Sequence, residues 1–225
     1  MPMLPPTRLE YREYELPDSF PVLVLTPQNG SPVRPLPVSA PQDGSPARTA
    51  PLLHFHNCIE IGLCHCGGHV LSFESRTYPL KPGDFFVLSP YSMHYVNHCG
   101  EDRPGCCEYL YLKPDVLLRD LYALDIPDEM CWYKNADVPF LFSAAEHSDV
   151  YRLLVLLLSE YRRQRENYRY IVKGFAQALM AQLTRALSPL GAPADEKYRS
   201  LSMLLPALRQ LHFHPEQPLE LARLA

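Results

Sequence analysis

The residues with the clearest chemical potential are two histidines and a glutamate in the segment His54-Phe55-His56-Asn57-Cys58-Ile59-Glu60. Side chains alternate between the two faces of a β-strand, so His54, His56 and Glu60 share one face if this strand is continuous. Two imidazoles and one carboxylate on one side are the ligand set of a two-histidine, one-carboxylate metal site. The spacing therefore predicts either a metal centre or a polar pocket.

His94 follows another predicted strand and is the candidate fourth ligand, with His69 and His98 as further candidates. These ligand types suit zinc, nickel or iron, and the composition of the set does not choose among them. The alternative is a pocket without an ion, in which neutral histidines hydrogen-bond one another, an effector or water.

Four tyrosines in the same region are candidate contacts for a sugar-like or aromatic effector. They are Tyr78, Tyr95, Tyr109 and Tyr111. For any one of them the alternative is core packing with the hydroxyl at the rim.

The chain has seven cysteines, an odd number, and none forms a Cys-x-x-Cys pair. Without a secretion signal we expect thiols rather than a disulfide framework. Cys64 and Cys66 share strand parity with Glu60 and could line the same cavity, although free cysteines are most often small buried residues. A thiol sensor, which could also use the adjacent Cys106 and Cys107, is the lesser alternative.

The elements that must position these residues are short strands. From residue 52 to 113 apolar and polar residues alternate, first over 53–63 and then over 70–74, 84–88 and 109–112. Turn residues such as Gly67-Gly68 separate the runs. Many short strands at regular spacing predict a sandwich or barrel.

After Pro114 the period becomes helical. We expect a short helix over 115–122, irregular structure over 123–145 and helices over about 148–165 and 167–187. The last helix places four apolar residues on one face, which are Ile171, Phe175, Leu179 and Leu183.

Twelve of the 24 prolines lie in residues 1–51. Proline fixes φ and lacks a donor, so this segment is expected to form an arm, edge strands and loops. Residues 1–150 carry a net charge of −9 (10 basic, 19 acidic) and residues 151–225 carry +5 (11 basic, 6 acidic). The basic end hints at a polyanionic partner, but for Arg162, Arg163, Arg165 and Arg169 a solvated helix face outweighs direct phosphate contact. We find no apolar run of membrane-spanning length and no secretory signal, which predicts a cytoplasmic protein.

The motif His54-x-His56-x₃-Glu60-x₆-Gly67 resembles the first cupin motif, and His94 falls where the second motif has its histidine. The stretch over 82–90 precedes it as in cupins. Ser92 stands where glycine is common, and this departure weighs against catalytic metal chemistry more than against the fold. The resemblance implies a mainly β protein with C-terminal helices (α+β), built on a cupin-type double-stranded β-helix barrel.

The order of elements extends the resemblance. A cupin-like barrel, two amphipathic helices, a linker and the segments over 201–212 and 218–225 together resemble an AraC-type bacterial transcription regulator. The division this implies is an N-terminal arm with entry strands (1–51), an effector-binding barrel (52–147), a helical dimerisation segment (148–187), a linker (188–198) and the truncated start of a helix-turn-helix DNA-binding domain (199–225).

The resemblance implies a ligand-sensing, dimerising protein that regulates transcription by sequence-specific DNA binding, and not an enzyme. It implies a small-molecule effector (a sugar or metabolite) near His54, His56, Glu60, His94, Tyr78, Tyr95 and Tyr109, no required cofactor and a homodimer. DNA contacts would lie mostly beyond Ala225. The alternatives are a metal-dependent cupin enzyme, such as a dioxygenase or isomerase using the histidine and glutamate cluster, and a sugar- or metal-binding module without DNA function.

Overall fold

The computed structural model describes residues 9–26, 53–73, 76–98, 106–122, 126–134 and 139–187. The expected linker, the expected start of the helix-turn-helix domain and residues 27–52 lie outside this described part of the chain.

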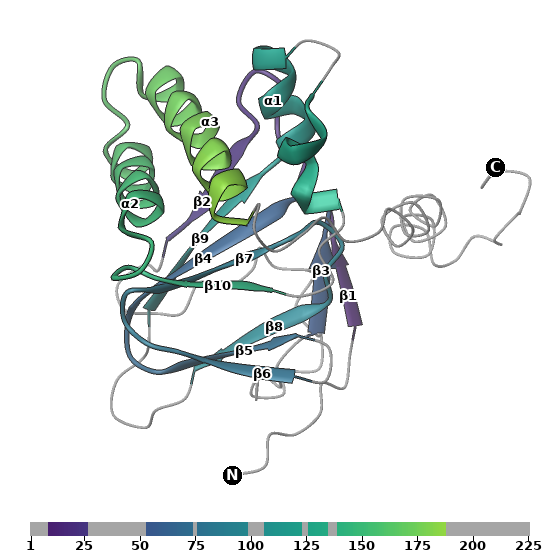
Figure 1. Cartoon of the computed structure of the whole chain (residues 1–225), viewed down its shortest axis with the longest axis vertical. Coiled ribbons are helices and arrows are strands. Elements are labelled where there is room, and N and C mark those ends of the chain that lie inside the picture. Colours follow the sequence, from purple (N-terminus) through teal and green to yellow (C-terminus); the bar gives the residue numbers. More distant parts are fainter. Residues whose placement is uncertain are drawn as a thin grey trace, which may run out of the picture.

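In the described part of the chain, ten strands form two five-stranded sheets that face each other (Figure 1). The first sheet has the order β1 (Leu9–Arg12), β3 (Leu53–His56), β8 (His94–His98), β5 (His69–Phe73) and β6 (Arg76–Leu80). The second has the order β10 (Phe140–Ser143), β7 (Asp84–Leu88), β4 (Ile59–Cys66), β9 (Cys106–Leu112) and β2 (Val22–Leu25). Neighbouring strands are antiparallel, except that β1 runs parallel to β3. The predicted fold class is confirmed, with two sheets rather than one closed barrel.

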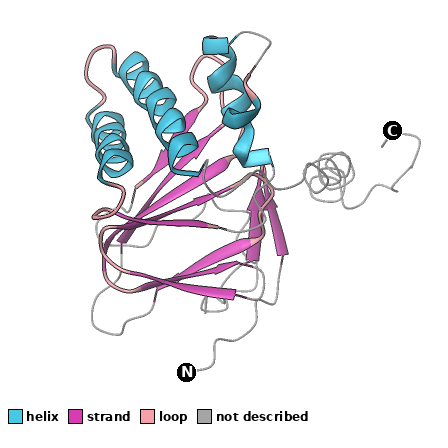
Figure 2. Ribbon diagram, in the orientation of Figure 1, coloured by secondary structure: helices cyan, strands magenta, loops and turns pink. Residues whose placement is uncertain are grey.

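The helices cover the outer face of the second sheet (Figure 2). They are α1 (Pro114–Tyr122), the 3₁₀ segment η1 (Asp128–Lys134), α2 (Ser148–Arg163) and α3 (Tyr168–Leu187). The larger apolar core lies between this sheet and the helices, where Ile61, Val87 and Leu110 pack in one cluster with Leu154 and Leu179. None of the described helices combines the length and the apolar character that crossing a membrane requires.

Strand alternation divides the second sheet into two chemically different faces. The odd-numbered residues of β4, such as Ile61 and Leu63, belong to the core under the helices. Cys64 instead packs between the sheets, in a cluster with Leu71 and Phe73 of the first sheet and Phe86 of β7. The inner faces of the two sheets therefore enclose an interior that carries the even-numbered residues of β4.

Two expectations about the strands are wrong. Residues 53–63 do not form one strand, because a bend at residues 57–58 separates β3 in the first sheet from β4 in the second. Residues 123–145 are not wholly irregular, because they contain η1 and also β10, which pairs with β7. Phe142 of β10 stacks on Phe85 with ring centroids 5.1 Å apart, so side-chain packing places this strand at the sheet edge.

The helix boundaries agree with the sequence, but the buried face of α3 is shifted. Leu179 and Leu183 are buried as expected, whereas Ile171 is 40% exposed. The buried stripe runs instead through Val172, Ala176 and Met180. An i, i+4 row drifts around a helix of 3.6 residues per turn, so its first member leaves the contact face.

The predicted edge strands near the N-terminus are confirmed, since β1 and β2 each lie at the edge of a sheet. Pro21 directly precedes β2, a position at which its missing N–H costs no ladder hydrogen bond.

The cysteine expectation is wrong for one pair, because Cys66 and Cys106 form a disulfide with Cα atoms 5.3 Å apart. The register of β4 and β9 shifts between Cys64 and Cys66, and this bulge places Cys66 opposite Cys106. Sequence parity alone did not predict the bulge. Cys58, Cys64, Cys107 and Cys131 are thiols, as expected.

Candidate metal centre

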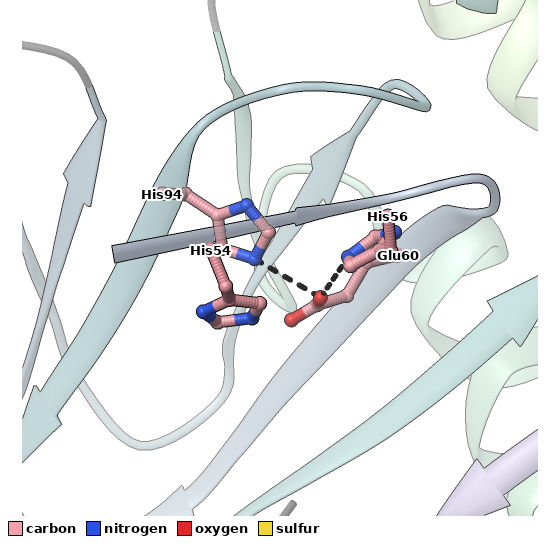
Figure 3. A group of neighbouring side chains, drawn as sticks. All are labelled: His54, His56, Glu60 and His94. Atoms are coloured by element: carbon pink, nitrogen blue, oxygen red, sulfur yellow. Dashed lines mark hydrogen bonds and ion pairs between the residues drawn. The ribbon is translucent and has the colours of Figure 1, made fainter. Parts of the chain in front are cut away.

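The four residues singled out by their spacing lie together in the structure (Figure 3). Each offers a ligand atom, and these atoms all lie within 4.8 Å of one another. Glu60 Oε2 is 2.7 Å from His56 Nε2 and 3.1 Å from His94 Nε2. His54 and His94 are cross-strand partners with ring centroids 4.4 Å apart.

The residues converge for a different reason from the one expected. His54 and His56 come from β3, His94 comes from the adjacent β8, and Glu60 comes from β4 in the opposite sheet. The chain turns at the bend over residues 57–58, so the inward faces of two sheets meet where one strand was predicted. The even numbering of His54, His56 and Glu60 was still a correct indicator, because β3 and β4 both direct their even-numbered residues into the space between the sheets.

The site is secluded from solvent. His56, Glu60 and His94 are at most 2% exposed, and His54 is partly exposed. A buried carboxylate among imidazoles requires compensation, because burying an unpaired charge is costly.

Backbone carbonyls fix the outer nitrogens of two rings. His56 Nδ1 lies 3.0 Å from the carbonyl oxygen of Cys58, and His94 Nδ1 lies 2.8 Å from that of Ser92. A carbonyl oxygen only accepts hydrogen bonds, so each Nδ1 carries the ring proton. Each Nε2 then faces Glu60 Oε2 at hydrogen-bond distance. This orientation, with the outer N–H held by a backbone carbonyl, is the one that metal-ligating histidines adopt.

The electrostatics agree with this arrangement. Burial lowers the pKa of His54 to about 2, and the neighbouring His94 lowers it further. Burial likewise lowers the pKa of His56, although Glu60 opposes the shift. Burial raises the pKa of Glu60, but His94 and His56 outweigh it and hold that pKa well below its usual range. An ionised carboxylate that faces two imidazole nitrogens is stabilised by protons on those nitrogens or by a cation in their place, so the donor set fits a divalent ion.

The N-terminal segment covers this cluster, which the sequence did not predict. Tyr14 lies 5.6 Å from the His56 ring and 4.5 Å from Tyr111 (centroid distances). Its backbone N–H donates to Asn57 Oδ1 at 2.9 Å, and Asn57 Nδ2 donates to the Tyr14 carbonyl at 3.2 Å. Burial raises the pKa of Tyr14 to about 12, with a further contribution from the charge of Glu60. Nothing in the sequence pairs residue 14 with residue 57, because their contact depends on the tertiary fold.

The structure distributes the four predicted tyrosines over different environments. Tyr111 lies 5.2 Å from the His56 ring (centroid distance) and is buried. Tyr109 and Tyr78 pack against the apolar cluster between the sheets. Tyr95 follows His94 on β8 and therefore points to the opposite face of that strand. Contact of Tyr78, Tyr95 and Tyr109 with an effector stays a prediction.

A pocket of about 150 Å³ opens beside the cluster. Its lining includes Asn57, Tyr91 and Lys113. The Tyr91 N–H donates to the His56 carbonyl oxygen at 2.7 Å, so a backbone hydrogen bond connects the pocket wall to the cluster. Tyr91 has φ of 64°, a left-handed conformation that sequence reasoning did not anticipate at a tyrosine.

Comparisons with known proteins agree with the fold. The family model described as the AraC-like ligand binding domain matches residues 42–184, which is more than half of the chain. No curated protein matches the sequence.

Solved structures are similar in fold at low sequence identity. The apo form of a variant of ToxT from Vibrio cholerae is 14% identical, with a TM-score of 0.54 over 95% of this chain and 70% of that one. ToxT with a bound unsaturated fatty acid is 10% identical, with a TM-score of 0.49 over 76% and 60%. The AraC-like transcriptional activator CuxR is 15% identical, with a TM-score of 0.36 over 71% and 54%. The first of these carries the likeness of fold, and at such identities no function follows from it.

Proposed function

Because this chain belongs to the family of the AraC-like ligand binding domain, we propose that it is the ligand-sensing and dimerising part of a transcription regulator. In this proposal a small molecule, such as a sugar or metabolite, binds between the sheets near His54, His56, Glu60 and His94. A C-terminal helix-turn-helix domain then binds DNA in a ligand-dependent way, and the regulator acts in the cytoplasm as a homodimer. The single observation that carries the sensing role is the direct contact between the buried cluster and the N-terminal segment.

That contact gives ligand binding a physical output. Tyr14 packs on His56, and its backbone is hydrogen-bonded to Asn57. A ligand that changes the position of the His56 ring changes the surface on which the segment over 9–26 packs. Binding shifts the conformation only to the extent that the ligand prefers one arrangement over the other.

A metal ion is part of the proposal. His56 Nε2, His94 Nε2 and Glu60 Oε2 would hold it, with His54 as the fourth ligand, and zinc, nickel or iron fits this donor set. A bound ion would supply a positive charge that attracts oxygen atoms of a ligand. The residues themselves orient the site, because the carbonyl groups of Cys58 and Ser92 fix the two rings.

Metal content tests this part. Each protein is incubated with Zn²⁺, Ni²⁺ or Fe²⁺, dialysed and subjected to elemental analysis. We expect the wild-type protein and the control variant His147→Gln to retain a bound ion that His56→Gln and His94→Gln lose. His147 is a partly exposed histidine at the start of α2 and is outside the cluster. An identical metal content in all four proteins would refute the metal site and leave the sensing role standing.

Ligand sensing is tested by thermal denaturation with sugars and organic acids. A ligand at a hundredfold excess over its Kd stabilises the folded protein by about 2.7 kcal/mol. This corresponds to a rise in Tm of roughly 5–10 °C for a protein of this size. The shift is expected to disappear in Glu60→Gln. A compound that raises Tm equally in Glu60→Gln binds elsewhere and contradicts the proposed location.

DNA binding is tested with the complete gene product. We expect sequence-specific binding to a promoter fragment, with an affinity that changes when the ligand from the thermal screen is added. A complete product that binds no DNA specifically would refute the regulatory role.

The second candidate function, a metal-dependent cupin enzyme, is favoured by one observation, the histidine and glutamate ligand set itself. An iron-loaded protein that oxidises or isomerises an organic substrate, and loses this activity in His94→Gln, would support it. Ligand-dependent DNA binding without turnover would support the regulator.

A further inference from the structure

A second group of ligand-type residues lies between the sheets. Cys64, His69 and Cys107 are all buried, at 1%, 6% and 4% exposure. The two sulfurs and a ring nitrogen lie within 4.8 Å of one another. This group, which we term the thiol cluster, contains none of the residues of the histidine and glutamate site.

The topology brings the thiol cluster together from positions far apart in the sequence. Cys64 of β4 and Cys107 of β9 are direct cross-strand partners in the second sheet. Gly67, with φ of 75°, lies in the turn that leads the chain from β4 to β5, and His69 is the first residue of β5 in the facing sheet. Glycine suits this left-handed position because it has no Cβ that would clash with the backbone.

We propose that Cys64, Cys107 and His69 form a buried binding site for a thiophilic metal ion, Zn²⁺ or Cu⁺. Thiolate and imidazole ligands select these ions over Mg²⁺ or Ca²⁺, which take oxygen ligands. Zinc binds sulfur at about 2.3 Å and nitrogen at about 2.0–2.1 Å. Donors around one ion are then separated by somewhat less than 4 Å, so atoms that already lie within 4.8 Å of one another need only small shifts.

The two thiols are already coupled. A hydrogen bond from Cys107 lowers the pKa of the Cys64 thiol, while the same interaction and burial raise the pKa of Cys107. Binding of a metal ion would release the protons of the thiols that become its ligands.

The thiol cluster is separate from the first site. Glu60 and Cys64 lie four residues apart on the same face of β4, which corresponds to about 13 Å along a strand. Between them Gly62 is covered by the ring of Phe86, which is fully buried. A single ion cannot reach both sites. Among the described residues, the interior therefore has two ligand sets of different chemistry, one with oxygen and nitrogen donors and the other with sulfur and nitrogen donors.

The neighbouring disulfide does not supply ligands. Cys66 and Cys106 are bonded to each other at the solvent-facing end of the same strand pair. Cys64 and Cys107 remain thiols at the adjacent, buried position.

Cobalt spectroscopy tests the proposal and separates it from the histidine site, because only a sulfur ligand gives thiolate-to-cobalt charge-transfer absorption. The reduced protein is titrated with Co²⁺ without oxygen. We expect the charge-transfer band in the wild-type protein, its loss in Cys64→Ser and Cys107→Ser, and its weakening in His69→Gln. Added Zn²⁺ or Cu⁺ should bleach the band, and competition between the two ions identifies the preferred one.

The controls are matched to each alternative. Cys131→Ser removes a thiol outside the cluster, the double variant Cys66→Ser/Cys106→Ser removes the disulfide cysteines, and His94→Gln disables the first site. All three should retain the band. A band that depends on Cys66 and Cys106 instead would overturn the assignment.

Folding of each variant is checked by circular dichroism. If the cysteine variants do not fold, alkylation of the wild-type protein replaces them, with Zn²⁺ expected to slow the labelling of Cys64 and Cys107 but not of Cys131. A folded, reduced wild-type protein with no charge-transfer band and no protection from alkylation would overturn the proposal. Recovery of a Cys64–Cys107 disulfide from a reduced protein that binds no metal would overturn it as well and would indicate a redox pair.

Discussion

Substitution of Gly62 by alanine tests the packing that divides the interior. Gly62 lies in β4 midway between Glu60 and Cys64, and it pairs with Phe86 of β7 and Tyr109 of β9. A Cβ added at Gly62 would overlap Cζ and Cε1 of Phe86 and lie 2.9 Å from its Cε2. Real Cβ atoms essentially never come within 3.0 Å of a neighbouring heavy atom, so a group must move.

The ring has little freedom to move. Phe86 is fully buried, and it packs with Leu71, Leu88 and Cys107 in the interior cluster. Overpacking of a tight core costs about 1–3 kcal/mol, and the overlap with three ring atoms places Gly62→Ala at the upper end of that range, at about 3 kcal/mol. For a protein of this size the expected fall in Tm is roughly 6–12 °C.

The assay is urea denaturation followed by circular dichroism, with Gly174→Ala as the control. Gly174 lies in α3, and a Cβ there meets no atom within 4 Å, so this change is expected to stabilise the helix by up to about 1 kcal/mol. The double variant Gly62→Ala/Phe86→Leu should be less destabilised than the sum of its single variants, because the smaller side chain makes room for the methyl group. A Gly62→Ala protein within about 0.5 kcal/mol of wild type would refute the close contact.

Three further predictions concern the helices and η1. Leu179→Ala should destabilise the protein by about 2–5 kcal/mol. Ile171→Ala on the same helix should destabilise it by less than about 1 kcal/mol, because Ile171 is 40% exposed. Equal effects of the two substitutions in urea denaturation would contradict the observed buried face of α3. Arg162→Ala should lower the free energy of unfolding by about 1–2 kcal/mol. Arg162 is half-exposed, and its Nη1 donates to both oxygens of the buried Glu108 carboxylate, at 2.7 and 2.5 Å. The control is Arg163→Ala at the exposed neighbouring residue, for which no measurable loss of stability is expected. The pKa of Tyr133 is raised by burial and, to a lesser extent, by the charge of Asp115. The Tyr133 hydroxyl donates to Asp115 Oδ1 at 2.7 Å, and the Lys134 ammonium lies over the Tyr133 ring. The protonated phenol is therefore favoured in the folded state, so the free energy of unfolding should fall as pH rises above the unfolded tyrosine pKa of about 10. Tyr133→Phe should make that fall smaller. Identical profiles of stability against alkaline pH in the two proteins would exclude Tyr133 as the source of the fall.

The sequence was sufficient to identify the fold class and the convergence of His54, His56, Glu60 and His94 in one buried cluster. Alternation along short strands indicated two-sided packing, and the parity of His54, His56 and Glu60 correctly indicated convergence. The reason given for it was wrong, because the bend at residues 57–58 divides these residues between two sheets. Periodicity reports which face a residue occupies, and it does not report where a strand leaves one sheet for another.

Contacts between distant segments were beyond sequence reasoning. The pairing of Tyr14 with Asn57 and the bulge that joins Cys66 to Cys106 depend on register between strands. The thiol cluster was recognised only as separate candidates, because Cys64 and Cys107 become neighbours through an antiparallel pairing over 43 positions. Alternation along one strand gives the face of each residue, but it does not give the partner strand or the register of the pairing.

The contact between Tyr14 and the first site leads to a prediction about regulation. Asn57→Ala removes two hydrogen bonds to the Tyr14 backbone, at 2.9 and 3.2 Å, and leaves every ligand atom of the site in place. The N-terminal segment is expected to lose about 1–2 kcal/mol of docking free energy, which hydrogen exchange at the Tyr14 amide would report.

Linkage makes the effect reciprocal. If metal binding at His56 and the docking of Tyr14 stabilise each other, undocking the segment must weaken metal binding by the same coupling factor. A coupling of about 1.4 kcal/mol corresponds to a tenfold change in Kd. The measurement is isothermal titration with Ni²⁺ in Asn57→Ala and wild type, with the distant Arg163→Ala as the control. Faster exchange at Tyr14 with an unchanged affinity for Ni²⁺ would show that the segment covers the site without sensing it, because a ligand that is indifferent to two arrangements cannot shift the balance between them.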